Sequence, residues 1–129
     1  MFNKGDIAQK LTCPLFDGKE YWVLTGAAMV LYGIKDNTKD IDLGASSEFI
    51  DELISKGYNY DFCDDGTRKI CFDEFEIFEN WIYGSINHIE NIPVISLEGL
   101  IELKRNLGRE KDVTDIALIE DFMKREEML

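Results

Sequence analysis

Apolar residues recur at helical spacing in five stretches of the chain, and several of these stretches are bounded by residues that cap or stop helices. Ser46 or Ser47 and Ser96 are suited to the N-cap position, because a serine hydroxyl accepts a hydrogen bond from the first turn. Gly33 and Gly57 are suited to helix ends, where a left-handed residue is common. The predicted helices are residues 4–11, 27–32, 48–56, 97–107 and 111–124.

Between these helices lie short apolar or alternating runs that predict strands. The run 21–24 is continuously apolar, which favours a first strand buried on both faces. Turn residues at 64–66 and 73–74 separate later runs and make the middle of the chain a strand-rich meander. Residues 81–91 carry only a weak pattern of strand or irregular structure. The predicted strands are residues 21–24, 40–43, 58–62, 68–72 and 75–78.

Length and composition predict one domain, residues 1–129, with a modest core made from a chain that is 45% hydrophobic. We expect a cytoplasmic protein, since no apolar segment approaches the roughly 20 residues that cross a bilayer and the first residues lack a signal-peptide pattern. Three cysteines without a CxxC pair predict free thiols, and a single histidine, His88, supports neither a triad nor a histidine metal site.

The formal net charge of −12 argues against binding to a nucleic-acid backbone, which requires a basic stripe. Only 14 lysines and arginines are present, and they are spread along the chain. A small molecule or a basic protein partner fits this charge better. No membrane partner is expected.

The stretch Leu24-Thr25-Gly26-Ala27-Ala28 combines the end of an apolar strand with the start of a helix, an arrangement that favours phosphate binding. We expect Gly26 to make the turn. After this helix comes a strand with Asp40 and Asp42, whose carboxylates would leave the same face with Cα atoms roughly 7 Å apart. Paired carboxylates of this kind suit Mg²⁺, which binds oxygen ligands together with substrate phosphates.

Three segments together resemble the DNA polymerase beta-like nucleotidyltransferase superfamily. Within it they resemble the minimal branch, which includes lincosamide and aminoglycoside nucleotidyltransferases and the nucleotidyltransferase-type proteins of toxin–antitoxin systems. The segments are residues 24–33, 38–43 and 93–116. The resemblance implies an α+β fold with a small mixed, mostly antiparallel sheet and helices packed on one side of it.

The resemblance also implies a catalytic set in which Asp40 and Asp42 hold Mg²⁺ with a third carboxylate from a neighbouring strand. The family usually has an aspartate at this third place, and the best positional match here is Glu76. Three other acidic residues are rivals for that role. They are Asp73, Glu74 and Glu79.

For the nucleotide, the resemblance implies that Thr25, Gly26 and Ala27 grip the triphosphate, where the family usually has Gly-Gly or Gly-Ser. Lys104 interrupts the apolar face of the predicted helix 97–107 and has two interpretations. It either pairs with a carboxylate such as Asp115 on the next helix or lies beside the triphosphate, as a lysine on this helix often does in the superfamily. The loop residues Arg109 and Lys111 also match the family motif.

The leading functional hypothesis is a Mg²⁺-dependent nucleotidyltransferase that moves a nucleoside monophosphate from a nucleoside triphosphate to a hydroxyl of a small molecule or protein. The alternative is a catalytically degenerate binding module of the same fold, antitoxin-like or an adaptor. An acidic partner-binding domain unrelated to nucleotides ranks third. At 129 residues the chain is short of the helical domain that binds acceptors in larger relatives, so a homodimer or a partner protein would complete the cleft.

Overall fold

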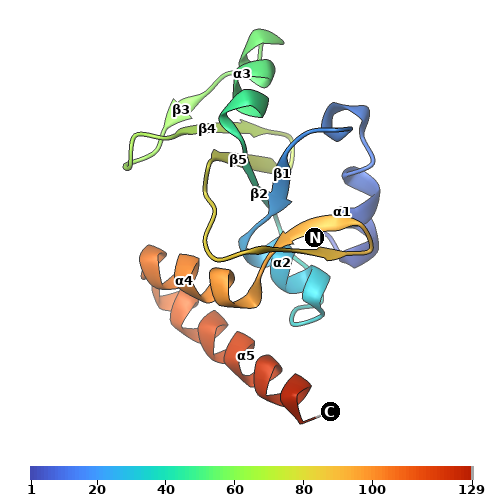
Figure 1. Ribbon diagram of the computed structural model, residues 1–129, viewed down its shortest axis with the longest axis vertical. Helices are drawn as coiled ribbons and strands as arrows, with labels where there is room; N and C mark the ends of the chain where they lie inside the picture. The colour runs from blue at the N-terminus through green and yellow to red at the C-terminus, as the bar shows by residue number, and fades with distance from the viewer. Residues whose placement is uncertain (129) are drawn as a thin grey trace.

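The computed structural model describes residues 1–128 and has an α+β architecture (Figure 1). Within these residues there are five α-helices and seven strands, with one 3₁₀ turn at Pro14–Phe16. The helices are α1 (Lys4–Lys10), α2 (Thr25–Tyr32), α3 (Ser47–Ser55), α4 (Leu97–Leu107) and α5 (Glu110–Glu127). The strands are β1 (Tyr21–Val23), β2 (Ile41–Ala45), β3 (Asp61–Phe62), β4 (Arg68–Phe72), β5 (Phe75–Glu79), β6 (Ile86–Ile89) and β7 (Ile92–Ile95).

The strands form one sheet in the order β3-β4-β5-β2-β1-β7-β6. Strands β2 and β5 run parallel, as do β1 and β7, while the remaining neighbours are antiparallel. The sheet is therefore mixed and only partly antiparallel, where the sequence predicts a mostly antiparallel one. The difference arises because long connections, one of them through α3, bring β5 back beside β2 in the same direction.

One face of the central strands is apolar and forms the core. The register places Leu43 of β2 beside Ile77 of β5 and opposite Val23 of β1, and all three are fully buried. Phe16 packs on this face, with its ring 5.1 Å from that of Phe75 and 6.1 Å from that of Phe49 in α3. Burial of side chains of this size stabilises the fold by roughly 1.5–3 kcal/mol each.

The opposite face of the same strands is more polar, because alternate residues point to opposite sides of a sheet. It carries Asp42 of β2 and Glu76 of β5 side by side, and Trp22 of β1 opposite Gly44. A Cβ at Gly44 would lie 2.1 Å from Nε1 of Trp22, so the indole can cover this strand only because residue 44 is glycine. This face holds the site described below.

Helices α4 and α5 pack against each other, and α4 also contacts α2 (Figure 1). Serine caps begin α3 and α4 as the sequence predicts, since the hydroxyl of Ser46 accepts from the Phe49 N–H and that of Ser96 accepts from the Gly99 N–H. Gly33 adopts φ 86° and ends α2. Across residues 1–128, every helix is too short or too polar to cross a membrane.

Candidate functional site

Segments that are far apart in the sequence meet at one cavity of about 510 Å³. The start of α2, the loop before β2, the middle of β5 and the α4–α5 junction all contribute to it. Its lining holds five lysine and arginine residues against four aspartate and glutamate residues, although the chain as a whole has 14 basic and 26 acidic residues. The lining residues are Met1, Thr25, Gly26, Lys35, Asn37, Thr38, Lys39, Asp40, Asp42, Glu76, Lys104, Arg109, Lys111 and Asp115.

The three carboxylates that the sequence singles out as catalytic, Asp40, Asp42 and Glu76, all line this cavity. Asp42 lies in β2 and is in register with Glu76 of the parallel neighbour β5, so both side chains leave the same face. Asp40 lies one residue before β2 begins rather than within the strand. The parallel pairing of β2 with β5 is what brings residues 34 positions apart in the chain together.

The surroundings of Asp42 shift its pKa. Burial raises its pKa, the hydrogen bond from Thr25 lowers it, and the neighbouring Glu76 raises it again, with the result that the pKa is about 6. Thr25 Oγ1 donates to Asp42 Oδ2 at 2.5 Å. Asp42 Oδ1 is buried without a hydrogen-bond partner among the described residues. A buried carboxylate oxygen in this state is well suited to accept a cation.

The turn that leads into α2 is made by Thr25 rather than by Gly26, which corrects the sequence prediction. Helix α2 begins at Thr25, two residues earlier than predicted, and Thr25 itself has φ 49° in the left-handed region. Threonine adopts this conformation at a cost, so the hydrogen bond to Asp42 must help to hold it. Gly26 has another role, because a Cβ there would lie 3.0 Å from Oγ1 of Thr38 in the loop before β2.

The first turn of α2 offers backbone donors to the cavity. Its N-cap, Leu24, makes no side-chain hydrogen bond to the described residues, whereas the N-caps of α1, α3 and α4 all do. Free N–H groups and the positive end of the helix dipole favour a negative ligand at this place. Thr25 and Gly26 line the cavity, but Ala27 is buried within α2 and is not among the described lining residues.

Lys104 both lines the cavity and forms a buried ion-pair cluster. Its Nζ lies 3.0 Å from Asp115 Oδ2 and 3.4 Å from Asp112 Oδ1, and only 2% of the residue is exposed. Burial raises the pKa of both aspartates, but hydrogen bonds from Arg109 to Asp112, and from Lys35 and Lys104 to Asp115, outweigh burial and leave both pKa values below their usual range. The pairing with Asp115 that the sequence suggests for Lys104 is therefore present.

Two basic residues of the loop before β2 belong to the site, although the sequence pattern indicates no role for them. Lys35 Nζ lies 2.9 Å from Asp115 Oδ1, and Lys39 lines the cavity without an ion pair to any residue in 1–128. The signal available in the sequence is the position of Lys39 directly before Asp40. Arg109 hydrogen-bonds Asp112 through Nε at 2.7 Å, and Lys111 lies beside it at the start of α5.

The rivals of Glu76 have other partners. Glu79 lies on the opposite face of β5, where Arg68 Nη2 donates to Glu79 Oε2 at 2.6 Å. Glu74 pairs with Lys10 at 2.9 Å, and Asp73 lies in the β4–β5 turn with φ 50°. None of the three lines the 510 Å³ cavity within the described chain. His88 is exposed on β6.

No group of three or more histidine, cysteine, aspartate or glutamate side chains in residues 1–128 is arranged to hold a metal ion on its own. Mg²⁺ does not need such a group, because it is commonly held by one or two carboxylates together with substrate phosphates. The unpartnered Oδ1 of Asp42 and the carboxylate of Asp40, which lines the same cavity, provide this smaller set of ligands, with Glu76 beside Asp42. The residues present therefore fit Mg²⁺ bound with a phosphate ligand.

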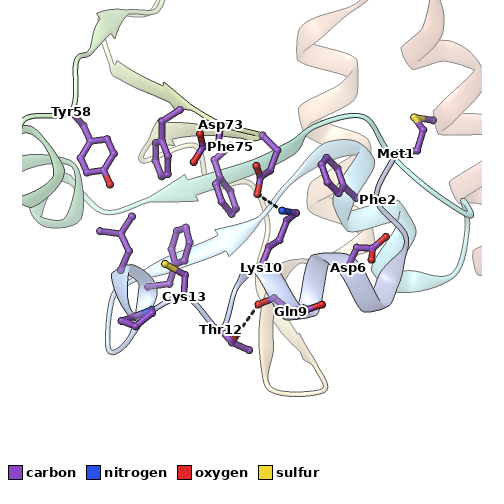
Figure 2. Close-up of a pocket in the computed structure, with 15 residues that line it drawn as sticks. Met1, Phe2, Asp6, Gln9, Lys10, Thr12, Cys13, Tyr58, Asp73 and Phe75 are labelled. Carbon is purple, nitrogen blue, oxygen red and sulfur yellow. Dashed lines mark hydrogen bonds and ion pairs between the residues drawn. The ribbon is translucent and has the colours of Figure 1, made fainter.

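A larger hollow of about 820 Å³ lies between α1 and the β4–β5 turn (Figure 2). Figure 2 shows Lys10 pointing into it, and Lys10 is held both by Glu74 and by the face of Phe2, 5.2 Å from the ring centroid. The charges of Lys10 and Glu74 are thus already balanced by each other, in contrast to that of Asp42. Size alone does not identify a functional site, and this hollow has the weaker chemistry.

Comparison with solved structures reveals a protein of similar fold. The chain aligns with a Thermotoga maritima protein, TM1012, described as a "putative nucleotidyltransferase", with a TM-score of 0.59 and 17% identity over 96% of both chains. A scan against family models gave no match, and neither did a search of curated proteins. At this identity the likeness concerns the fold alone, and the chain therefore has a nucleotidyltransferase-like fold.

Proposed function

We propose that this protein is a Mg²⁺-dependent nucleotidyltransferase that moves a nucleoside monophosphate from a nucleoside triphosphate to a hydroxyl of a small molecule or protein. The observation that carries the proposal is the state of Asp42, whose Oδ1 is buried and unpartnered among the described residues, beside Glu76 and in a cavity rich in cations. The acidic pair Asp42 and Glu76, which we call the β2–β5 corner, lines the same cavity as five lysine and arginine side chains, which we call the basic wall. Together they are complementary to a metal-bound triphosphate.

The basic wall would hold the leaving part of the nucleotide. Lys39, Arg109 and Lys111 line the cavity, and the uncapped start of α2 adds backbone donors from Thr25 and Gly26. Lys104 contributes its positive charge from within its aspartate cluster. Arginine and lysine side chains recognise phosphate oxygens through charge-assisted hydrogen bonds. These groups orient the triphosphate and spread the charge that grows on the leaving pyrophosphate.

Asp42 and Asp40 would hold Mg²⁺, which when bound neutralises phosphate charge and polarises the α-phosphate. Glu76 lies at the cavity in register with Asp42 and would accept the proton of the acceptor hydroxyl. The hydroxyl oxygen then forms a bond to the α-phosphorus, and the bond from this phosphorus to the bridging oxygen breaks. Pyrophosphate leaves with the electron pair of that bond. Most of the rate enhancement would come from positioning and charge neutralisation.

Thermal unfolding with each of the four nucleoside triphosphates, with and without Mg²⁺, tests the binding part of this proposal. A ligand at 100-fold above its dissociation constant stabilises the folded state by about 2.7 kcal/mol. We expect this stabilisation only with Mg²⁺ and expect Asp42→Asn to abolish it. Asp17→Asn, an exposed aspartate outside the cavity, is the matched control. Absence of any Mg²⁺-dependent shift would contradict nucleotide binding at this site.

A second candidate, a binding module of the same fold without turnover, is favoured by one observation. Thr25 Oγ1 is hydrogen-bonded to Asp42 Oδ2, so one oxygen of the central carboxylate already has a partner. Release of pyrophosphate separates the two candidates. Release that disappears in Asp42→Asn supports the transferase, while Mg²⁺-dependent binding without release across a broad set of acceptor hydroxyls supports the binding module.

A further inference from the structure

A second cavity of about 430 Å³ is lined in part by the same two elements as the first, β5 and α4. On β5, Glu76 lines the first cavity and Phe78 lines the second, and residues two apart on one face of a strand are about 7 Å apart. On α4, Lys104 lines the first cavity while Leu103 and Leu107 line the second. The volume of the second cavity is in the range of small-molecule pockets. We call it the aromatic groove, after Phe78, Trp81 and Tyr83 in its lining.

The aromatic wall of this groove is rigid. The rings of Phe78 and Trp81 are stacked, with centroids 4.2 Å apart and planes 20° apart. The Trp81 indole donates to Thr67 Oγ1 at 3.1 Å, and the Trp81 carbonyl accepts from the indole of Trp22 at 2.8 Å. An aromatic pair fixed at its ring, its side-chain N–H and its backbone is preorganised to receive another flat ring.

The charges around the groove select against anions. Asp64 and Asp65 line it, and the only basic residue in its described lining is Lys69. The Lys69 ammonium lies 5.8 Å from the centroid of the Phe78 ring, where the aromatic face already attracts it. A neutral or cationic ring fits these charges, while a carboxylate-bearing ring would meet two like charges.

The order of groups along the parallel strands β2 and β5 decides which substrate would lie in the groove. Lys39 and Asp40 lie at the start of β2, the pair of Asp42 and Glu76 follows, and Phe78 comes after that pair. In phosphoryl transfer the attacking and leaving oxygens lie roughly in line across the phosphorus. If pyrophosphate leaves toward Lys39 at the start of β2, the hydroxyl approaches from the opposite end of the strands, where the aromatic groove begins.

We propose that the aromatic groove is the acceptor subsite and that it takes a flat, ring-bearing hydroxyl compound that is neutral or cationic. This inference rests on the proposed transferase function for the identity of the reaction. Glu76 lines the first cavity two residues before Phe78 on the same face of β5, where it would receive the proton of a hydroxyl carried by a ring stacked at Phe78 and Trp81. The ring binds through stacking, and the acidic rim excludes anionic analogues.

Titration with two matched phenols, followed by the indole N–H resonances in NMR, tests the ring site. The chain has two tryptophans, and Trp81→Phe assigns their signals. We expect tyramine, a cationic phenol, to shift the Trp81 resonance more than that of Trp22, which is 5% exposed. 4-Hydroxyphenylacetate, the anionic counterpart, should bind at least about tenfold more weakly. Equal binding of both phenols, or no shift of Trp81 with tyramine, would overturn the proposal.

Filling the groove provides the variant test. Asn106 lines the groove from α4, and its neighbour Arg105 is exposed on the same helix outside the lining. Asn106→Trp should raise the Kd of tyramine at least about tenfold, as expected for loss of a stacking site, while Arg105→Trp leaves it unchanged. Both variants should keep the stabilisation by Mg²⁺ and nucleoside triphosphate. Unchanged tyramine binding in Asn106→Trp would place the ring elsewhere and contradict the inference.

Simultaneous binding separates an acceptor subsite from a nucleobase subsite. The Trp81 shift caused by tyramine should persist when the protein is saturated with Mg²⁺ and a non-hydrolysable ATP analogue. Competition between tyramine and the analogue would overturn the proposal, because the groove would then hold the nucleobase. If tyramine shifts Trp81 but no nucleotide binds under any condition, the ring site stands, the proposed transferase function fails, and the acceptor role fails with it.

Discussion

Two clusters of carboxylates, each with at least one member in the lining of the 510 Å³ cavity, are in opposite electrostatic states. At the α4–α5 junction, Asp112 and Asp115 are matched by Lys104, Lys35 and Arg109 at distances of 2.7–3.4 Å. At the β2–β5 corner, Asp42 and Glu76 lie side by side with no ion pair to any basic residue in 1–128. The junction cluster is therefore balanced by the fold itself, while the carboxylates of the β2–β5 corner have no basic partner within residues 1–128.

The two clusters differ in how the surrounding protein shifts the pKa values of their buried carboxylates. The paired aspartates keep pKa values below their usual range, but that of Asp42 rises to about 6. A buried carboxylate that the fold leaves uncompensated destabilises the free protein, and groups with such shifted pKa values are concentrated at functional sites. The junction cluster, in contrast, holds basic side chains at the cavity wall.

The largest effect is expected from Lys104→Ala, which tests whether the junction cluster is structural. Its removal leaves two buried carboxylates with fewer cations, and we expect a loss of about 3 kcal/mol in the free energy of unfolding, measured by urea denaturation. Lys111→Ala, at an exposed lysine of the same cavity, should stay within about 0.5 kcal/mol of the parent protein. Similar losses in both variants would remove the distinction between the clusters.

Asp42→Asn tests the β2–β5 corner, and here we expect the free energy of unfolding to increase. The pKa of Asp42 is about 6 in the folded protein and about 4 in the unfolded chain, so the charged carboxylate destabilises the folded state. The free energy of unfolding therefore falls as pH rises from about 4 to about 6. Without Mg²⁺, the variant should be about 2–3 kcal/mol more stable than the parent protein at pH 8 and similar to it at pH 3.5. A variant that is less stable at pH 8 would show that Asp42 is compensated within the fold.

Glu79 provides a compensated carboxylate on the same strand as Glu76. Hydrogen bonds from Arg68 lower the pKa of Glu79 to about 2, against the effect of burial. The charged carboxylate therefore contributes fully to the free energy of unfolding above pH 4.5, and this contribution is lost as pH falls toward 2. Glu79→Gln should cost about 1–2 kcal/mol at pH 7, less than the shift alone implies because Arg68 is partly solvated. The difference between the two proteins should shrink between pH 4.5 and 2. A constant difference would assign the loss to packing.

Elements whose pattern is local are predicted well from the sequence. Strand β4 and helix α4 have the predicted bounds, because alternation and the serine cap Ser96 are encoded within a few residues. Strand β3 is shorter than predicted, with Asp61–Phe62 at the exposed edge of the sheet. At an edge, few neighbouring side chains are available to stabilise the two tyrosines in the rest of the run, Tyr58 and Tyr60.

Features that depend on pairing between distant segments cannot be predicted from the local sequence pattern. The Asp-Ile-Asp motif marks Asp42, but the parallel register with β5 that selects Glu76 over Glu74 and Glu79 exists only in the folded sheet. Lys35 and its partner Asp115 are 80 residues apart. The stretch 81–91 has a weak pattern, and the position of Trp81 in it depends on two contacts outside the stretch. Its ring stacks on Phe78 of β5, and its indole N–H donates to Thr67. Their positions follow from the sheet order.

The smallest effect concerns Thr25, where the corner meets the first turn of α2. Glycine at this position relieves the cost of φ 49° but removes the hydrogen bond to Asp42, and each of these contributions is about 1 kcal/mol. We expect Thr25→Gly to leave the free energy of unfolding within about 1 kcal/mol of the parent protein. It should nevertheless raise the pKa of Asp42, because the Thr25 hydroxyl lowers it.

The carboxyl ¹³C titration of Asp42 measures this change directly, and Thr25→Ser is its matched control because serine keeps the hydroxyl. A higher pKa in Thr25→Gly and an unchanged one in Thr25→Ser would show that the hydroxyl stabilises the charged form of Asp42. Equal pKa values in all three proteins would assign Thr25 a purely conformational role at the start of α2. In that case, loss of the Thr25 hydroxyl in Thr25→Gly would remove the side-chain donor to Asp42 Oδ2 without changing the pKa of Asp42.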